Sequence, residues 1–461
     1  MSANSTFNRE APLSRGRGAG LPAGQAGGEV FTASSPGRLD VMGGFADYSG
    51  SLVLQMPISN DTTVSIKLRN DFICRLISHL PDGKQETTFD YRILEHSNYQ
   101  TAHQALTKDS KKSWIAYVIG CAFTLEQAKR IDFKGADFSI QSNIPLGKGV
   151  SSSAALEVAT MKALAAAFGI SFSRTELPTL AQRVENQIVG APCGLMDQLT
   201  SYFGKSGYLL PITCQPDILH QPISIPNEIQ FIGIDSGVRH AVSGSSYTDV
   251  RCAAFMGYSI IAKHLGLSAK DIIHARESGD RKSLPYQGYL SNISPEEFER
   301  SFKKILPEKI RGKDFISQNQ NTIDPATRVK EDNDYAVFNC TAHPIYENAR
   351  VVKFMEAIRS INKNGNDHKQ LQTLGELIHE SHTGYSNCGL GSERTDEIVE
   401  IAKEYSTHGI FGAKITGGGS GGAVCLLAVG DEGIQSAKKI HRMMEERYRT
   451  ELSLFVTGSP V

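Results

Sequence analysis

The stretch PLGKGVSSSAALEV, residues 145–158, places two glycines and three consecutive serines directly before an alanine-rich pattern of helical spacing. A helix N-terminus offers unpaired N–H groups and the positive end of the helix dipole, so it suits a phosphate group. Gly147 and Gly149 let a ligand approach the backbone closely, and the hydroxyls of residues 151–153 can bind phosphate or magnesium. A serine N-cap before a core helix explains the same letters about equally well. On its own, the stretch leaves both interpretations open.

A second glycine-rich stretch, TGGGSGG at 416–422, satisfies the string GxGxxG. A dinucleotide-binding fold needs a helix after these glycines and an acidic residue about 20 positions further on. Residues 423–429, AVCLLAV, are typical of a strand, so we reject that fold and predict strand, glycine turn and strand over 412–429. The turn either closes over a ligand or is a plain hairpin. A P-loop is also excluded, because GKS at 204–206 lacks the leading glycine.

A third stretch, SPGRLDVMGGFADYSGSLVLQMPI at 35–58, places Arg38 and Asp47 beside glycines just before a predicted strand. As isolated features, these two residues are typical of a surface arginine and a turn aspartate. They become informative only together with the other two glycine or serine stretches.

The remaining pattern mixes helices and strands in both halves of the chain, which indicates α+β domains that meet near residue 230. Strands are predicted at 50–58, 62–68, 72–78, 136–144 and 229–237, and helices at 113–129, 151–169, 294–306, 343–361 and 369–381. We therefore predict a flexible tail over 1–28, domains over 29–230 and 231–461, and an inserted polar, helical subregion or lid over 266–342.

Composition limits the classes of function. The 461 residues carry a formal net charge of −1, which argues against nucleic acid or a membrane surface as the main partner. No run approaches the ~18 apolar residues of a transmembrane helix. The cysteines have neither disulfide nor zinc-site spacing, so we expect free thiols and a cytoplasmic enzyme. They are Cys74, Cys121, Cys193, Cys214, Cys252, Cys340, Cys388 and Cys425.

Taken in order along the chain, the three stretches resemble the GHMP kinase superfamily, over about residues 30–455. That family has an N-terminal substrate motif, a Pro-x-x-x-Gly-x-Ser-Ser-Ser-Ala-Ala phosphate loop and a late glycine-rich turn. The resemblance implies a two-domain α+β fold with an N-terminal ribosomal-protein-S5-like α/β domain and a C-terminal ferredoxin-like domain. It also implies an active site in the cleft between the two domains.

Three further segments resemble the galactokinase-like branch of the family. They are VENQIVGAPCGLMDQLTSYFG at 184–204, DSGVRHAVSGSSYTDVR at 235–251 and ESHTGYSNCGLGSERTDEIV at 380–399. We interpret Arg239 and His240, within the second segment, as structural residues.

The first motif departs from galactokinases, because Gly44 and Phe45 stand where those enzymes carry glutamate and histidine. The glutamate and histidine help bind the distal hydroxyls of the sugar, including its exocyclic hydroxymethyl group. A site without them favours a sugar that lacks this group, such as L-arabinopyranose. Residues 41–58 and 341–351 also resemble L-arabinokinases, of which the plant forms carry an extra N-terminal region that this chain is expected to lack.

The resemblance implies a transfer of the ATP γ-phosphoryl group to the anomeric hydroxyl of L-arabinose. Asp197 would accept the hydroxyl proton, and Arg38 would neutralise charge in the transition state. Glu185 and Ser153 would hold Mg²⁺, and Trp114 would contact adenine, although a core tryptophan is the alternative. The implied ATP-binding residues are Trp114, Gly147, Gly149, Val150, Ser151, Ser152, Ser153 and Ala154. The implied sugar-binding residues are Arg38, Gly44, Phe45, Asp47, Gly194, Asp197, Tyr247, Gly418 and Gly419.

Other functions remain open. A galactokinase with a modified pocket and a uronic-acid 1-kinase are the nearest alternatives, although Gly44 and Phe45 supply no cation for a carboxylate. A non-catalytic sugar sensor is disfavoured by the intact serine-alanine run, Ser151–Ala155. The predicted partners are ATP, Mg²⁺ and a monosaccharide, and the predicted state is a monomer or a weak homo-oligomer.

Overall fold

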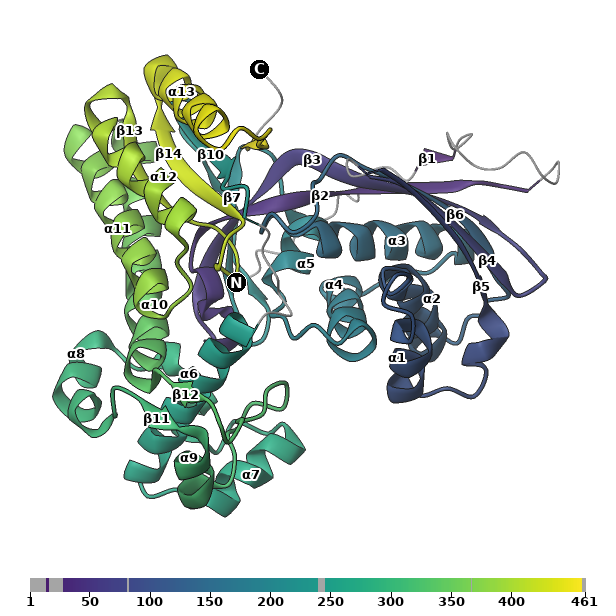
Figure 1. The fold of residues 1–461 in the computed structure, drawn as a ribbon, viewed down its shortest axis with the longest axis horizontal. Helices are drawn as coiled ribbons and strands as arrows, with labels where there is room; N and C mark the ends of the chain where they lie inside the picture. Colours follow the sequence, from purple (N-terminus) through teal and green to yellow (C-terminus); the bar gives the residue numbers. More distant parts are fainter. Residues whose placement is uncertain (1–13, 16–27, 81–82, 239–244, 366, 458–461) are drawn as a thin grey trace, which may run out of the picture. The chain divides into compact units, whose positions relative to one another are not determined.

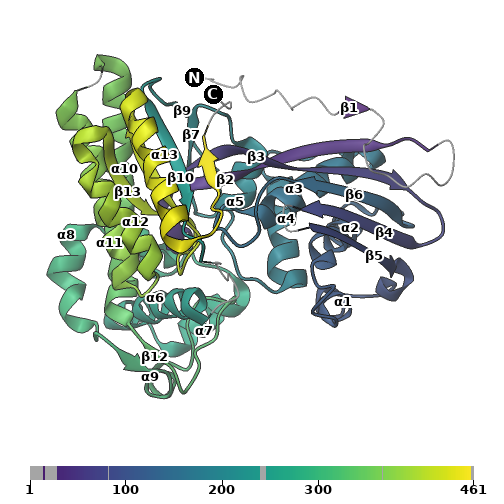
Figure 2. The same cartoon turned by 45° about the horizontal axis from the view of Figure 1, so that its top comes forward.

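The computed structural model describes residues 14–15, 28–80, 83–238, 245–365 and 367–457 (Figures 1 and 2). Most of the predicted tail at 1–28, together with Arg239 and His240, lies outside the described residues. The chain divides into two compact units that interleave in sequence. Unit 1 comprises Met1–Pro36, Asn60–Pro145 and Ser153–Gly190; unit 2 comprises Gly37–Ser59, Leu146–Ser152 and Ala191–Val461.

Unit 1 is built on strands of one sheet. They are β1 (Ser14–Arg15), the start of β2 (Phe31–Met42), the end of β3 (Leu52–Leu68), β4 (Ile73–Leu80), β5 (Gly83–Asp90) and β6 (Ala136–Ser142). Strand β6 pairs antiparallel with β3 and parallel with β4, and β4 pairs antiparallel with β5. The helices of unit 1 lie on one face of β4, β5 and β6 (Figure 1).

Those helices include two of the five that the sequence predicts. They are the 3-10 turn η2 (Tyr91–Leu94), α1 (Tyr99–Thr107), α2 (Ile115–Lys129), α3 (Ser152–Phe168), α4 (Glu176–Arg183) and the π-helical turn η3 (Val184–Val189). Helix α2 confirms the prediction at 113–129, and α3 confirms the one at 151–169. The alanine-rich face of α3 is buried, with Ala154, Ala155 and Ala159 at 0% exposure.

The sequence predicts two strands at 50–58 and 62–68, but β3 is one continuous strand of 17 residues. The predicted break falls on Ser59, Asn60 and Asp61. Asn143 keeps this polar segment extended, because its side-chain oxygen accepts from the Asp61 N–H (2.8 Å). The Asn60 amide in turn donates to the Asn143 carbonyl (3.0 Å).

Unit 2 contains a four-stranded antiparallel sheet in the order β13-β14-β10-β15. Its strands are β10 (Ile229–Asp235), β13 (Ile410–Ile415), β14 (Ala423–Val429) and β15 (Leu454–Val456). Strands β13 and β14 confirm the prediction of two strands around a glycine turn over 412–429. There are also three shorter strands, β7 (Tyr208–Thr213), β8 (Ile218–Leu219) and β9 (Ile223–Ser224). Strand β7 pairs with the start of β3, and β8 and β9 each pair with β7.

Helices cover this sheet in unit 2 (Figure 2). They are α10 (Val337–Asn364), α11 (His368–Asn387), α12 (Glu393–Glu404) and α13 (Gly430–Tyr448), with the 3-10 turn η8 (Ser406–His408). Buried aliphatic residues of α12 and α13 pack against β10, β13 and β14. Helices α10 and α11 confirm the predictions at 343–361 and 369–381, although α10 begins before Pro344. In the described part of the chain, no helix combines the length and apolar character needed to span a membrane.

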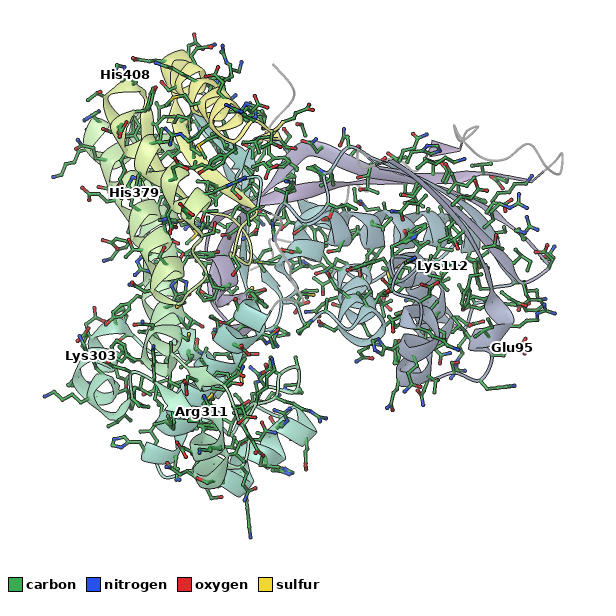
Figure 3. The ribbon with its side chains drawn as sticks, viewed as in Figure 1. Glu95, Lys112, Lys303, Arg311, His379 and His408 are labelled. Carbon is green, nitrogen blue, oxygen red and sulfur yellow. The ribbon has the colours of Figure 1, made fainter. Side chains whose placement is uncertain are left out.

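The predicted insertion at 266–342 is helical and polar on its surface, where Lys303 and Arg311 are exposed (Figure 3). It follows α6 (Ser245–His264) and contains α7 (Ala269–Ser278), η4 (Pro285–Gly288), η5 (Leu290–Asn292), α8 (Pro295–Glu297), η6 (Phe298–Phe302), η7 (Lys303–Ile305), β11 (Ile310–Arg311), α9 (Gly312–Asn319) and β12 (Asp334–Tyr335). The predicted amphipathic helix at 294–306 forms as one continuous helical run over 295–305, but its turns are of α, π and 3-10 type in α8, η6 and η7. The wider π turn still buries both Phe298 and Phe302.

Candidate active site

Residues 146–152, which include most of the predicted phosphate loop at 147–154, belong to unit 2 and have an unusual backbone. Gly147 and Gly149 have φ angles of 69° and 70°, and Ser151 has a φ of 59°. The left-handed region costs a serine energy that a glycine does not pay, and such strain gathers at functional sites. Helix α3 begins at Ser152, immediately after this turn.

Arg38 and Asp197 form a two-pronged ion pair, although they are 159 residues apart in the chain. Arg38 donates from Nε to Asp197 Oδ1 (2.8 Å) and from a terminal nitrogen to Oδ2 (2.9 Å). Burial lowers the pKa of Arg38, but the charges of Asp197 and Asp40 and the hydrogen bonds to Asp197 together outweigh that effect, so the pKa is raised overall. Asp197 lies in the first turn of α5 (Met196–Phe203), and its side chain is 21% exposed.

The phosphate loop holds the same ion pair. Ser151 Oγ donates to Asp197 Oδ2 (2.5 Å), and the second terminal nitrogen of Arg38 donates to the Gly149 carbonyl (2.6 Å). The backbone N–H of Arg38 also donates to the Val150 carbonyl (3.0 Å). The structure therefore brings the two predicted catalytic residues and the loop together within unit 2.

Asp47 lies in η1 (Gly44–Ser49), is 4% exposed and accepts from the Tyr48 N–H (2.8 Å). Burial raises the pKa of the Asp47 carboxyl to about 7, and the charge of Asp197 adds to this rise. Gly194 approaches it so closely that a Cβ there would lie 1.6 Å from Asp47 Oδ2. Gly194 therefore acts by its small size, which leaves room for the carboxylate.

The glycine turn at 416–422 packs against the phosphate loop and Arg38. A Cβ at Gly417 would lie 2.8 Å from the Gly149 carbonyl oxygen and 3.3 Å from an Arg38 terminal nitrogen. Gly419 has a φ of 77° and meets Leu390, and Gly418 lies between these two positions. The glycines thus allow the turn to close on the loop, which a plain exposed hairpin would not require.

Behind Gly44 lies a buried polar network that the sequence reasoning missed. Lys414 donates to Asp40 Oδ2 (2.6 Å), and both side chains are 0% exposed. Asp40 Oδ1 accepts from Gln55 (2.6 Å) and from the Gly44 N–H (3.0 Å). A Cβ at Gly44 would lie 2.0 Å from the Tyr385 hydroxyl. Asp40 lies two residues after Arg38, and Lys414 lies two before the glycine turn, so their positions within the motifs were the available signal.

Phe45 is a packing residue in this structure, with 1% exposure. Its ring stacks on His343 with centroids 4.2 Å apart and meets Tyr385 edge-on at 4.8 Å. Burial lowers the pKa of His343 to about 4, so its ring is neutral near pH 7. Neither ring nitrogen of His343 has a hydrogen-bond partner among the described residues.

Tyr247, on α6, is 7% exposed, and its ring meets Tyr48 edge-on at 6.2 Å. Because Tyr48 follows Asp47 in the chain, the structure brings Tyr247 near the carboxylate of Asp47, which is predicted to bind the sugar. A second lysine that the sequence reasoning missed, Lys148, lies within the phosphate loop and pairs with the buried Asp235 at 2.8 Å.

The other predicted residues belong to unit 1. Trp114 is the residue before α2, Ser153 and Ala154 lie in the first turn of α3, and Glu185 is buried in η3. No group of three or more His, Cys, Asp or Glu side chains in the described ranges could hold a metal ion. A magnesium ion held by one carboxylate and one hydroxyl, and completed by phosphate oxygens and water, would need no such group.

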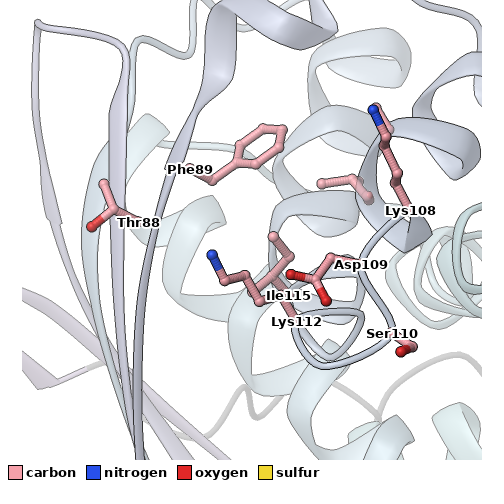
Figure 4. A pocket seen from close by; sticks show the side chains of 9 residues that line it. Thr88, Phe89, Lys108, Asp109, Ser110, Lys112 and Ile115 are labelled. Atoms are coloured by element: carbon pink, nitrogen blue, oxygen red, sulfur yellow. The ribbon is translucent and has the colours of Figure 1, made fainter.

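Unit 1 also has an open pocket of about 510 Å³ beside the start of α2 (Figure 4). Phe89 of β5 and Ile115 of α2 supply apolar walls, and Lys108 and Lys112 supply cations. Trp114 is not among its lining residues, but its neighbour Ile115 is. The pocket therefore adjoins, along the chain, the residue predicted to contact adenine.

Three models of known families match segments of the chain. The galactokinase galactose-binding signature matches residues 24–68, which include Arg38 and Asp47. The GHMP kinases N terminal domain matches 116–205, and the GHMP kinases C terminal family matches 354–450.

Individual proteins show the same likeness. The chain is 37% identical to an L-arabinokinase of Arabidopsis thaliana over 94% of its own length, but it spans only 46% of that protein. It is 29% identical to a galactokinase of Chloroflexus aurantiacus, covering 87% of this chain and 84% of that one.

Among solved structures, Lactococcus lactis galactokinase complexed with galactose superposes with a TM-score of 0.69, at 22% identity, over 93% of each chain. Methanococcus jannaschii mevalonate kinase gives 0.52, at 16% identity, over 94% of this chain and 98% of that one. These likenesses confirm the predicted two-domain, mixed α/β fold. With its N- and C-terminal family segments and its galactokinase signature in the predicted order, the chain belongs to the GHMP kinases.

Proposed function

We propose that this protein is an ATP-dependent sugar 1-kinase and that its sugar is L-arabinose. The observation that carries the proposal is the ion pair of Arg38 and Asp197 against the phosphate loop, in a chain 37% identical to an L-arabinokinase. The reaction transfers the γ-phosphoryl group of ATP to the anomeric hydroxyl and leaves ADP and a sugar 1-phosphate.

Asp197 is the proposed acceptor of the hydroxyl proton. Three donors, two on Arg38 and one on Ser151, fix the orientation of its carboxylate. A fixed carboxylate can hold the anomeric hydroxyl in line with the γ-phosphorus, and positioning supplies much of the catalysis in phosphoryl transfer. The guanidinium of Arg38 also places a positive charge beside the transferring group.

The phosphate loop is the proposed holder of the ATP phosphates, through its backbone N–H groups, that of Ser151 among them, and through the Ser152 and Ser153 hydroxyls. Glu185 and Ser153 are the residues proposed to bind Mg²⁺, which would neutralise charge on the phosphate oxygens. Trp114 is the proposed contact for adenine.

The choice of L-arabinose rests on the first motif. A side chain at Gly44 would collide with the Tyr385 hydroxyl, and the Phe45 ring is buried against His343. Neither position presents a polar group to a hydroxymethyl substituent of the sugar. Asp47, Gly194 and Tyr247 are the proposed contacts for the ring hydroxyls, and Gly418 and Gly419 are proposed to lie beside the sugar and the transferring group.

An ATP-coupled assay over L-arabinose, D-galactose, D-glucuronate and D-galacturonate tests this proposal. We expect the highest kcat/KM for L-arabinose. If D-galactose is as good a substrate, the interpretation of Gly44 and Phe45 is wrong, and galactokinase becomes the function. That second candidate is favoured by the galactose-binding signature at 24–68.

A further inference from the structure

Arg251, on α6, has one guanidinium nitrogen without a partner. Its Nε donates to Asp324 Oδ2 and one terminal nitrogen donates to Asp324 Oδ1, both at 2.9 Å. The other terminal nitrogen is buried and has no hydrogen-bond partner among the described residues. The Arg251 side chain is 10% exposed and that of Asp324 is 0% exposed. A buried charged donor without a partner is costly, so this nitrogen calls for an acceptor that a ligand would bring.

The unpartnered nitrogen lies in the neighbourhood of the proposed sugar residues. The Arg251 guanidinium sits over the Tyr48 ring, 5.4 Å from its centroid, and Tyr48 touches Tyr247 edge-on. Tyr48 follows Asp47, and its own hydroxyl is buried with no partner in the described ranges. Burial raises the pKa of Asp47, while the Arg251 charge opposes that rise, so the two groups are close enough to interact.

We propose that Arg251 is a further sugar-binding residue, donating from its unpartnered nitrogen to a hydroxyl oxygen of the substrate. This inference rests on the proposed function, because it takes the ligand beside Asp47 to be a sugar. Asp324 already balances the Arg251 charge, and Asp47 adds a second carboxyl nearby. A neutral hydroxyl therefore fits this place better than the carboxylate of a uronic acid or a phosphate group.

The same contact gives the inserted segment 266–342 a role in positioning. Asp324 accepts from the Thr327 hydroxyl (2.7 Å) and from the Ala326 N–H (3.2 Å). Arg276 ties down the same loop by donating to the Thr327 carbonyl (2.9 Å). The segment thus holds the Asp324 carboxylate in a fixed position. This carboxylate binds Nε and one terminal nitrogen of Arg251, so only the other terminal nitrogen remains for the sugar.

The test uses Arg251→Lys and the pair Arg251→Gln with Asp324→Asn. The paired change removes the donor without leaving a buried carboxylate unpaired, so it guards against a simple failure to fold. The control is Arg69→Gln with Asp137→Asn, an arginine–aspartate pair in unit 1 (2.9 Å) outside every proposed site, in which Arg69 also pairs with the exposed Asp71. Thermal unfolding of each variant checks that the fold is retained.

Steady-state kinetics with L-arabinose and its monodeoxy analogues should separate binding from structural damage. We expect kcat/KM for the sugar to fall about 10- to 100-fold in both Arg251 variants, with KM for ATP within twofold of wild type. One deoxy analogue, lacking the hydroxyl that Arg251 contacts, should be a poor substrate of the wild type but no worse than L-arabinose in the Arg251 variants. The control pair should change none of these ratios.

The inference is overturned if the Arg251 variants keep the wild-type sugar kcat/KM, or if every deoxy penalty persists in them. In that case the wild-type activity still supports the proposed function. If the wild type phosphorylates no sugar in the panel, the proposed function fails. Calorimetric titration of L-arabinose into wild type and variants then tests the role of Arg251 separately, because binding needs no turnover. Equal affinity in wild type and variants, or no binding, overturns the inference.

Discussion

Replacing Asp47 by asparagine should stabilise the protein at pH 8 and weaken its binding of sugar. Burial raises the pKa of Asp47 from its ordinary value of 3.8 to about 7. Between these two pH values the folded state binds more protons than the unfolded state, so stability falls as the pH rises. Above pH 7 the ionised carboxyl destabilises the fold by about 4 kcal/mol. The Asp47→Asn variant keeps the shape and the acceptor for the Tyr48 N–H but removes this cost.

Urea unfolding of wild type and Asp47→Asn at pH 5 and pH 8 measures the effect. The stability advantage of the variant should grow by about 3 kcal/mol between these pH values, because wild-type Asp47 ionises in the folded state over this range. Taking the difference between the two proteins cancels the titration of all other groups. A variant that is less stable than wild type at pH 8, or an advantage independent of pH, would refute the reasoning.

The same variant tests the sugar contact. An ionised Asp47 is the stronger acceptor, so KM for the sugar should rise in wild type as the pH falls below 7. In Asp47→Asn the KM should be about 10- to 100-fold higher and should lose this pH dependence. If the stability prediction holds and KM is unchanged, Asp47 is buried for a reason other than sugar binding.

Three other substitutions probe the site. Asp197→Asn should lower kcat by about 10²- to 10⁴-fold in the coupled assay; near-normal turnover would remove Asp197 as the proton acceptor. Gly194→Ala should raise the sugar KM by about 100-fold, since its Cβ would lie 1.6 Å from Asp47 Oδ2; an unchanged KM would mean that the carboxylate moves aside freely. Lys148→Met should destabilise the fold by about 3 kcal/mol in urea unfolding, because it leaves the buried Asp235 without its ion-pair partner. Adding Asp235→Asn should restore most of this stability, and no rescue would contradict the pairing.

The site was predictable where its chemistry lies in continuous stretches of sequence. The left-handed backbone of residues 146–152 is indicated by the glycines within that stretch. Asp197 lies in a segment, 184–204, whose sequence resembles galactokinases. The pair of Asp40 and Lys414 was not predicted, because each partner alone is an ordinary charged residue. Lys414 is 374 residues from Asp40, and no local pattern marks either as buried.

Secondary structure shows the same division. Helices α2 and α3 follow from apolar spacing within one segment, so they appear in the prediction. Strand β2 does not, since Pro36 and Gly37 lie inside it and both residues normally argue against a strand interior. Strand β3 was divided in the prediction because its continuity depends on Asn143, which directly follows β6.

The proposed preference for L-arabinose cannot be assigned to Gly44 and Phe45 alone. Tyr385 fills the space that a side chain at position 44 would need, and its hydroxyl donates to the Gly417 carbonyl at 2.7 Å. His343 occupies one face of the Phe45 ring. The first motif, α10 and α11 are therefore packed tightly against one another. A polar side chain at position 44 would require Tyr385 to move and would disturb the glycine turn. The proposed lack of a polar group for the hydroxymethyl substituent would thus depend on the packing of three segments, and Gly44 and Phe45 are only the part of it that belongs to the first motif.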